Sequence, residues 1–195
     1  MTKRTETKRI LAVMSEFGYW GIELVGPMRK LEAAGYKFDF VSPKGKRSPV
    51  LPPSTDTTYI DPPLGVCVTT PGDKALVDAF EAAPALNATM NLSTMFPERP
   101  YYSRPNFLRE LEAYYETRRL AQESALATYD AILLVGGSGP IVDMVNNQRV
   151  HDLVLGFHAA GRPIGAICYG VAALVFSRDF NERKSILKGK HVTGH

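Results

Sequence analysis

The chain is most specific at residues 163–170, which read Pro-Ile-Gly-Ala-Ile-Cys-Tyr-Gly and are followed by Val-Ala-Ala-Leu at 171–174. A short apolar run ends at Cys168, and a helix-forming run of small residues begins just after it. Small residues at such a place let the backbones of a strand and a helix come close together. The pattern predicts a nucleophile elbow, a sharp strand-to-helix turn that exposes the side chain of Cys168. The dipole of the following helix favours a thiolate there. The alternative is a buried structural cysteine, because cysteine is among the most buried residue types.

Apolar runs elsewhere predict further strands of the same sheet. Residues 10–14 and 129–135 are apolar without alternation, as in strands that are buried on both faces. Residues 36–41 predict another strand. Helical spacing of apolar residues is found over residues 24–35, 74–82, 106–127 and 149–160. Strands that alternate with helices predict an α/β fold with a mostly parallel sheet and helices on both faces.

Two long connections and the C-terminal residues complete the expected domain. Residues 42–71 are rich in proline and threonine and predict a long connection with one edge hairpin. Residues 84–105 predict an irregular, aromatic-rich segment, of the kind that forms lids or interfaces. Residues 190–195 predict a final strand. We expect residues 1–195 to form a single domain that is truncated or cleaved at its C-terminus, because a strand at this place would lead into further structure.

Composition and charge exclude several classes of protein. The chain of 195 residues is long enough to bury a core, and its two cysteines are too few for a disulfide framework. The net charge of +3 is mild and lacks the basic stripe with interleaved aromatic residues of a nucleic-acid surface. The sequence contains neither a signal sequence nor a segment long enough to cross a bilayer. We therefore expect a cytoplasmic protein that acts on a small molecule and binds neither nucleic acid nor membrane.

A glycine-rich loop follows the strand predicted at residues 129–135. Its sequence, Gly-Gly-Ser-Gly at residues 136–139, offers backbone N–H groups that few side chains cover. Sites in a parallel sheet gather at the carboxyl ends of the strands, so we expect this loop to lie near Cys168. Together with the N–H of Tyr169, the loop would form an oxyanion hole. An ordinary glycine turn is the alternative. A phosphate-binding loop is less well supported, because neither the six-position glycine pattern nor a following Lys-Ser/Thr is present.

Two carboxylates follow the first predicted strand. Glu23 lies among apolar residues, where burial favours a protonated carboxyl that can share its proton with a thiolate. A surface carboxylate near a helix N-terminus is the alternative. The pattern favours Glu23 over Glu16 as a partner of the cysteine.

The sequence does not identify an imidazole partner for the thiol. His151 and His158 lie seven residues apart on one predicted helix, and we expect both at the surface or at its boundary. His191 and His195 lie on the predicted final strand. No cluster of His, Cys or acidic residues has the spacing of metal ligands, so we expect no metal and no cofactor. Cys67 lies in a proline-rich region, and we expect it to be structural.

Together these motifs resemble the ThiJ/PfpI superfamily, which shares the class I glutamine-amidotransferase-like fold and includes glyoxalase III. The resemblance spans nearly the whole chain and rests on residues 22–27, 129–139 and 166–170. It implies a flavodoxin-like three-layer α/β sandwich of the larger, insertion-bearing kind, and a homodimer.

The resemblance also implies a role for each candidate site residue. Cys168 would be the elbow nucleophile and Glu23 the protonated partner carboxyl, and the backbone N–H groups of Gly137 and Tyr169 would be the oxyanion donors. Two positions depart from the catalytic members. Tyr169 stands where many of them have histidine, and Ser138 stands where the glyoxalase-like members often have histidine. Both departures remove an imidazole.

These observations lead to four hypotheses about function. The first is a cysteine-dependent enzyme acting on a small carbonyl compound or related electrophile, as a glyoxalase III-like lyase or hydratase. The second is a redox-sensing or chaperone-like stress protein, in which Cys168 is oxidised to a sulfinic acid without turnover. The third is a glutamine amidotransferase-like hydrolase, which is less well supported because the expected His-x-Glu pair does not follow Cys168. The fourth is a structural subunit that has kept the fold and lost the activity.

Overall fold

A parallel sheet forms the centre of the structure, a computed structural model that describes residues 7–179 and 181–194. Its described strands are β1 (Arg9–Val13), β2 (Lys37–Ser42), β5 (Met90–Asn91), β6 (Ala131–Leu134) and β7 (Ile164–Ala166). They lie in the order β5-β2-β1-β6-β7, and every neighbouring pair is parallel. The α/β class and the mostly parallel sheet are therefore confirmed.

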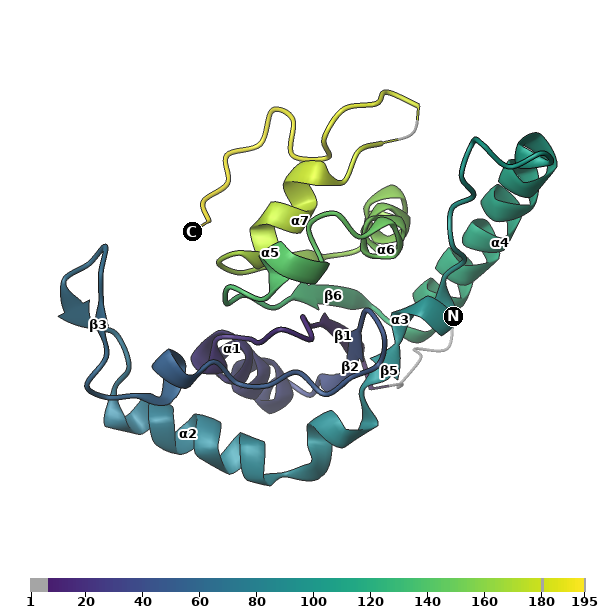
Figure 1. Cartoon of the computed structure of the whole chain (residues 1–195). Coiled ribbons are helices and arrows are strands. Elements are labelled where there is room, and N and C mark those ends of the chain that lie inside the picture. Colours follow the sequence, from purple (N-terminus) through teal and green to yellow (C-terminus); the bar gives the residue numbers. More distant parts are fainter. Residues whose placement is uncertain (1–6, 180, 195) are drawn as a thin grey trace.

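Helices cover both faces of this sheet (Figure 1). One face carries α1 (Gly21–Ala33) and α2 (Pro71–Ala82), and the other carries α5 (Pro140–Asp143), α6 (Gln148–Ala159) and α7 (Gly170–Phe176). The remaining helices are α3 (Leu92–Met95), α4 (Phe107–Thr128) and the short 3-10 helices η1 (Pro52–Thr55) and η2 (Pro84–Ala88). The three layers match the flavodoxin-like sandwich that the resemblance implies.

The central strands are buried on both faces, as their unbroken apolar runs predict. Successive side chains of a strand point to opposite faces. Leu11 and Val13 of β1 therefore lie in the core on the α6 side, and Ile10 and Ala12 lie in the core on the α1 side. Each fully buried large aliphatic side chain contributes about 1.5–3 kcal/mol relative to an exposed one. The two cores fix the sheet between its helical layers.

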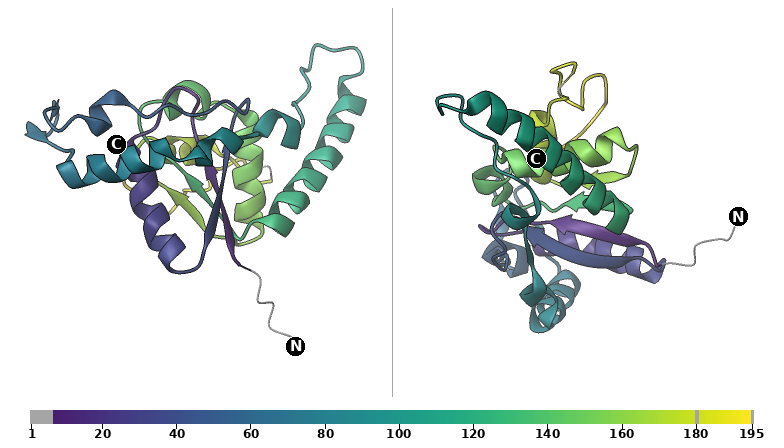
Figure 2. Two further views of the ribbon diagram at one scale, coloured as in Figure 1. Left: turned by 90° about the horizontal axis from the view of Figure 1, so that it is seen from below. Right: turned by 90° about the vertical axis from the view of Figure 1, so that its right-hand side faces the viewer.

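Two elements extend from opposite sides of the sandwich. A two-stranded antiparallel hairpin, formed by β3 (Ile60–Asp61) and β4 (Val66–Cys67), projects on one side, and α4 projects on the other (Figures 1 and 2). A hairpin is therefore confirmed within residues 42–71, but it forms a separate two-stranded sheet and does not pair with an edge of the main sheet. Among the described residues, no helix has both the length and the apolar character to span a bilayer.

The sheet differs from the prediction at two places. Residues 84–105, predicted as irregular, contain β5, which pairs with β2 at one edge of the sheet. Residues 190–194 form no strand, so the predicted final strand is wrong over these residues, and His195 lies outside the described residues. The reason is that Val192 is the only large apolar residue of this segment and is itself 51 % exposed, so the segment buries no apolar side chain against the sheet.

Candidate active site around Cys168

The carboxyl ends of β1, β6 and β7 meet where the strand order reverses. From β1 the chain builds the sheet outward through β2 to β5 on one side, and through β6 to β7 on the other. Open α/β sheets bind ligands in the crevice at such a switch point. The segments that follow these three strands are residues 14–23, 135–139 and 167–169. The topology therefore brings together the residues that the sequence marks as candidates.

Cys168 lies in the turn between β7 and α7 with a φ of 52°, in the left-handed region that residues with a side chain rarely adopt. The N–H of Gly170 donates to the carbonyl oxygen of Ile167 (2.8 Å), and the N–H of Val171 donates to that of Cys168 (3.1 Å). Glycine is needed at 170 because a Cβ there would lie 2.6 Å from the carbonyl oxygen of Leu134. Strained residues of this kind gather at functional sites, where the surrounding structure holds them in place.

Glu23 and Cys168 meet beside Gly136. Glu23 lies in the first turn of α1 and hydrogen-bonds to the Cys168 thiol. A Cβ on Gly136 would overlap Oε2 of Glu23 and would lie 2.6 Å from Cβ of Cys168. Only glycine therefore fits at position 136 while the carboxyl and the thiol remain neighbours.

Burial raises the pKa of the Cys168 thiol above its ordinary value. The backbone N–H groups of Gly137 and Tyr169 lower this pKa, whereas the charge of Glu23 and its hydrogen bond raise it further. The expectation that the following helix makes this cysteine a thiolate is therefore wrong in its net direction. The helix α7 has only seven residues, and the loss of water around the half-buried sulfur outweighs the N–H groups.

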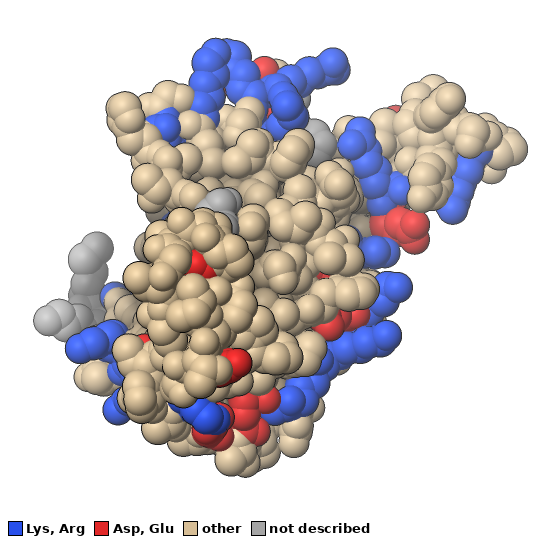
Figure 3. Space-filling view, turned by 60° about the vertical axis from the view of Figure 1, so that its left-hand side comes forward, with Lys and Arg blue, Asp and Glu red and all other residues tan. Residues whose placement is uncertain are grey.

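A cavity of about 490 Å³ adjoins Cys168. The hairpin forms one of its walls, and the rings of Trp20 and Tyr59 lie 6.4 Å apart beside it. Two carboxylates, those of Glu23 and Asp61, line the cavity, and none of the described residues around it is Lys, Arg or His. The middle of the surface on the hairpin side is largely uncharged, and most Lys and Arg side chains lie around its margins (Figure 3). The cavity therefore offers acidic and apolar groups to a ligand.

The carboxylate of Glu16 hydrogen-bonds to the end of β2 and the loop after it, and it does not line this cavity. Its Oε1 accepts hydrogen bonds from Oγ of Ser42 (3.1 Å) and from the backbone N–H of Lys46 (3.3 Å). Its own N–H donates to Oδ2 of Asp143 (2.8 Å). Of the two carboxylates that the sequence singles out, the structure thus brings only Glu23 to the thiol.

The described histidines lie away from the cavity at Cys168. Nε2 of His151 is 2.8 Å from a backbone carbonyl oxygen, and burial lowers the pKa of this imidazole. His158 and His191 are exposed, and His195 lies outside the described residues. Within residues 7–179 and 181–194, no group of three or more His, Cys, Asp or Glu side chains is arranged to hold a metal ion.

The sequence did not identify Trp20, Tyr59 and Asp61 as residues of the site. Trp20 lies in the aromatic and glycine-rich stretch after β1, and its backbone N–H donates to the carbonyl oxygen of Gly136 (3.2 Å). Tyr59 and Asp61 belong to the hairpin, whose weak strand signals gave no sign that it would form a wall of the cavity. Cys67, on the same hairpin, is exposed and donates its thiol hydrogen to a backbone carbonyl oxygen at 3.1 Å.

Comparisons with known proteins agree with this architecture. A profile of the family described as ThiJ/PfpI family-like matches residues 14–190. The solved structure of Rapid Encystment Protein 24 kDa from Francisella tularensis is 26% identical with a TM-score of 0.63, and the match covers 96% of this chain and 69% of that one. The structure of glyoxalase III from Candida albicans is 18% identical with a TM-score of 0.64, and the match covers 96% of this chain and 68% of that one. At this identity the second likeness shows the fold alone. A comparison with curated proteins finds no match.

Proposed function

The chain belongs to the ThiJ/PfpI-like family, and on this premise we propose that it is a cysteine-dependent enzyme acting on a small carbonyl compound. The reaction we favour is of the glyoxalase III type, in which methylglyoxal and water give lactate. One observation carries the proposal: the Cys168 thiol contacts the Glu23 carboxyl and two backbone N–H groups, beside a cavity. The likeness in fold to a glyoxalase III is consistent with this choice.

The first step is the attack of the thiol on the aldehyde carbon. Because burial and Glu23 raise the pKa of Cys168, the thiol holds its proton at neutral pH and needs a base. Glu23, whose charge raises that pKa, acts here as a carboxylate and not as the protonated carboxyl that the sequence predicts, and it accepts the proton as the bond between Sγ and carbon forms. The electron pair of the carbonyl bond moves to oxygen, and the N–H groups of Gly137 and Tyr169 stabilise the resulting oxyanion. Protonation by Glu23 gives a neutral hemithioacetal.

The second step moves a proton between the two carbons of the former dicarbonyl. Glu23, again a carboxylate, removes the hydrogen from the carbon bound to sulfur, and the electron pair forms a carbon–carbon double bond while the neighbouring carbonyl oxygen takes up a proton. Glu23 then returns its proton to the second carbon, and the hydroxyl on the first carbon gives up its proton to replace the one taken up by the second oxygen, so that its own carbon–oxygen bond becomes double. The product is a thioester of lactic acid on Cys168. Water then cleaves the carbon–sulfur bond, which releases lactate and restores the thiol. The first carbon is oxidised and the second is reduced, so no external oxidant or reductant is needed.

The composition of the cavity supports a neutral substrate. The described lining residues include two carboxylates, from Glu23 and Asp61, and no cationic side chain. An anionic substrate would be repelled at this low-dielectric site. The amidotransferase alternative is less well supported, because no described histidine lines the cavity to serve as the base of a Cys–His pair.

Turnover of methylglyoxal, followed by the formation of lactate, tests the proposal. We expect Cys168→Ser to abolish turnover and Cys67→Ser, the matched control, to retain it. Unchanged turnover in Cys168→Ser would refute the assignment. The redox-sensing alternative is separated by titration with peroxide and intact-mass measurement, since a sensor gains oxygen atoms at Cys168 at low oxidant. Redox sensors depend on a low-pKa thiol, and the raised pKa of Cys168 favours the enzyme.

A further inference from the structure

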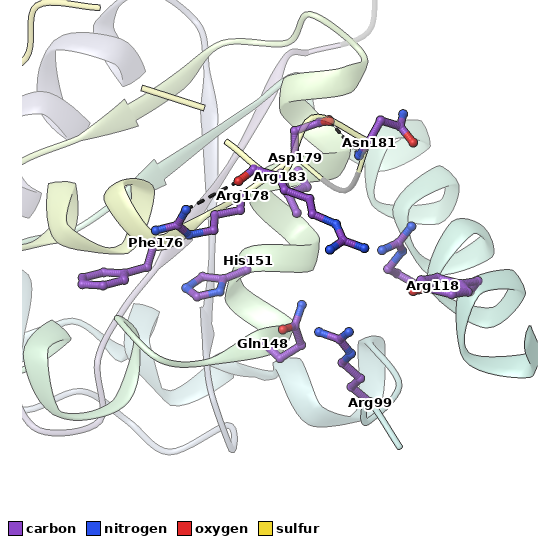
Figure 4. A pocket seen from close by; sticks show the side chains of 11 residues that line it. Arg99, Arg118, Gln148, His151, Phe176, Arg178, Asp179, Asn181 and Arg183 are labelled. Atoms are coloured by element: carbon purple, nitrogen blue, oxygen red, sulfur yellow. Dashed lines mark hydrogen bonds between the residues drawn. The ribbon is translucent and has the colours of Figure 1, made fainter. Parts of the chain in front are cut away.

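A second and larger cavity, of about 750 Å³, is lined by residues of α4, α6 and the segment after α7 (Figure 4). None of its lining residues is shared with the cavity at Cys168. The proposed function makes no use of it.

Four arginines line this cavity, from three separate parts of the chain. Arg99 follows α3, Arg118 lies on α4, and Arg178 and Arg183 lie in the segment after α7. The guanidinium groups of Arg99, Arg118 and Arg183 point toward one another at one end of the cavity (Figure 4). Within residues 7–179 and 181–194, Arg99, Arg178 and Arg183 form no salt bridge. The guanidinium group of Arg178 lies apart from them, near Phe176 (Figure 4). Three like charges held together in this way favour a bound anion.

The nearby carboxylates neutralise only part of this charge. Asp152 is fully buried and accepts hydrogen bonds from the hydroxyl of Tyr114 (2.5 Å) and from Nε2 of Gln148 (3.0 Å). Its Oδ1 also lies 3.9 Å from Nη1 of Arg118. Asp179 lines the cavity, but its Oδ1 accepts hydrogen bonds from the backbone N–H groups of Asn181 and Glu182. At the cluster of Arg99, Arg118 and Arg183, the one carboxylate of Asp152 against three guanidinium groups leaves two positive charges, which match a dianion.

Two parts of the arginine cluster are held in place, the side chain of Arg118 by packing and the backbone of Arg183 by a local turn. The side chain of Arg118 is 16% exposed, and its guanidinium carbon lies 5.1 Å from the centre of the Tyr115 ring. Arg183 has a φ of 54°, and its N–H donates to the carbonyl oxygen of Asp179 (2.8 Å) in a turn bridged between Arg178 and Ser185. Groups that are fixed before binding lose less conformational entropy when the ligand arrives.

The opposite end of the cavity combines an aromatic ring with the guanidinium group of Arg178 (Figure 4). The ring of Phe176 lies there, with His151 between it and the arginine cluster of Arg99, Arg118 and Arg183 (Figure 4), and Leu155 also lines the cavity. The volume is within the range of sites for small organic ligands. A phosphate monoester carries a charge of about −1.5 to −2 near neutral pH, and guanidinium forks match its oxygens. We propose that this cavity binds a phosphorylated small molecule, with its phosphate at the arginine cluster and its apolar or aromatic part near Phe176.

Isothermal titration with adenosine 5′-monophosphate, phenyl phosphate and adenosine tests this proposal. We expect both phosphate monoesters to bind and adenosine to bind at least about tenfold more weakly, since a charge-assisted hydrogen bond contributes at least this much. Equal binding of adenosine and its monophosphate, or no binding of either phosphate monoester, would overturn the proposal.

Matched variants locate the binding to the arginine cluster. Arg99→Gln/Arg183→Gln removes two exposed charges from it, and Arg29→Gln/Lys30→Gln removes two exposed charges from α1, on the opposite face of the sheet. We expect the first variant to bind the monoesters at least about tenfold more weakly and the second to bind them as the parent does. Arg99→Gln alone gives a smaller loss of affinity for the monoesters. This single variant replaces the double variant in the comparison if the double variant melts at a lower temperature than the parent. Equal affinity in both double variants would overturn the proposal. Cys168→Ser keeps the affinity, so the result is independent of the proposed enzyme activity.

Discussion

Replacement of Gly136 by alanine tests whether the contact between Glu23 and Cys168 is set by the glycine loop. The new Cβ would overlap Oε2 of Glu23 and would lie 2.6 Å from Cβ of Cys168 and 2.6 Å from the carbonyl oxygen of Ile167, where ordinary contacts begin at 3.4 Å. The loop, the thiol and the carboxyl must therefore separate by about 1 Å. A misplacement of about 1 Å in an active site lowers the rate about 100-fold. Overpacking of a close-packed site costs about 1–3 kcal/mol in the free energy of unfolding.

The assay compares the methylglyoxal turnover and the melting temperature of Gly136→Ala with those of Gly72→Ala. For a chain of this size the stability loss corresponds to a fall in Tm of about 2–12 °C. Gly72 is the matched control because it lies on α2 and its nearest neighbour to a new Cβ is Oγ1 of Thr70 at 3.7 Å. Alanine there keeps or raises the stability. A Gly136→Ala protein with the parent Tm and parent turnover would refute the geometric reasoning.

Three further variants probe the charges and hydrogen bonds of the structure. Glu23→Gln removes a charge that raises the pKa of Cys168, so we expect the pH midpoint of its alkylation by iodoacetamide, which lies above that of an ordinary cysteine in the parent, to fall while turnover is lost. An unchanged midpoint would contradict the assigned contact. Tyr114→Phe removes the 2.5 Å hydrogen bond to the buried carboxylate of Asp152. We expect urea denaturation to show a loss of about 1.5–3 kcal/mol in the free energy of unfolding, and an unchanged urea midpoint would count against this hydrogen bond. His191→Ala removes an exposed imidazole that does not line the Cys168 cavity, so we expect unchanged kcat and KM for methylglyoxal. A large loss of kcat would show that another conformation brings this residue to the site.

The fold could be predicted from the sequence where elements are long and buried. The strand β6, and β1 after its first residue Arg9, are apolar because helices cover both of their faces. Three-turn helices such as α6 show their apolar residues at helical spacing, since one side packs on the sheet. The strand β5 has only two residues, too few for any periodicity to be visible. The strand predicted at residues 190–194 is wrong for the opposite reason: the composition of this segment permits a strand, but the segment has no apolar face that packs against the sheet.

The candidate site could be predicted only where it follows from strand ends. Cys168, Glu23, Gly137 and Tyr169 lie together because parallel strands end at one edge of the sheet, and this proximity is what the sequence pattern implies. Their chemical roles stay predictions. The hairpin with Tyr59 was not identified as part of the site, because its position over the cavity is decided by tertiary packing and not by the local sequence. The direction of the pKa shift at Cys168 also depends on burial, which a local pattern does not report.

Among residues 7–179 and 181–194, no histidine lines the cavity at Cys168, and this changes how charge moves in the proposed reaction. A Cys–His pair starts as two opposite charges, whereas here the thiol and the Glu23 carboxylate share one proton and one negative charge. When the thiol attacks, the proton passes to Glu23 and the negative charge moves to the substrate oxygen. This oxygen lies next to the N–H groups of Gly137 and Tyr169, which hydrogen-bond to the sulfur before the reaction. The negative charge is thus displaced over a short distance, and no new charge is created in the cavity. The left-handed φ of Cys168 serves this arrangement, because it holds the sulfur between the carboxyl and both N–H groups at once.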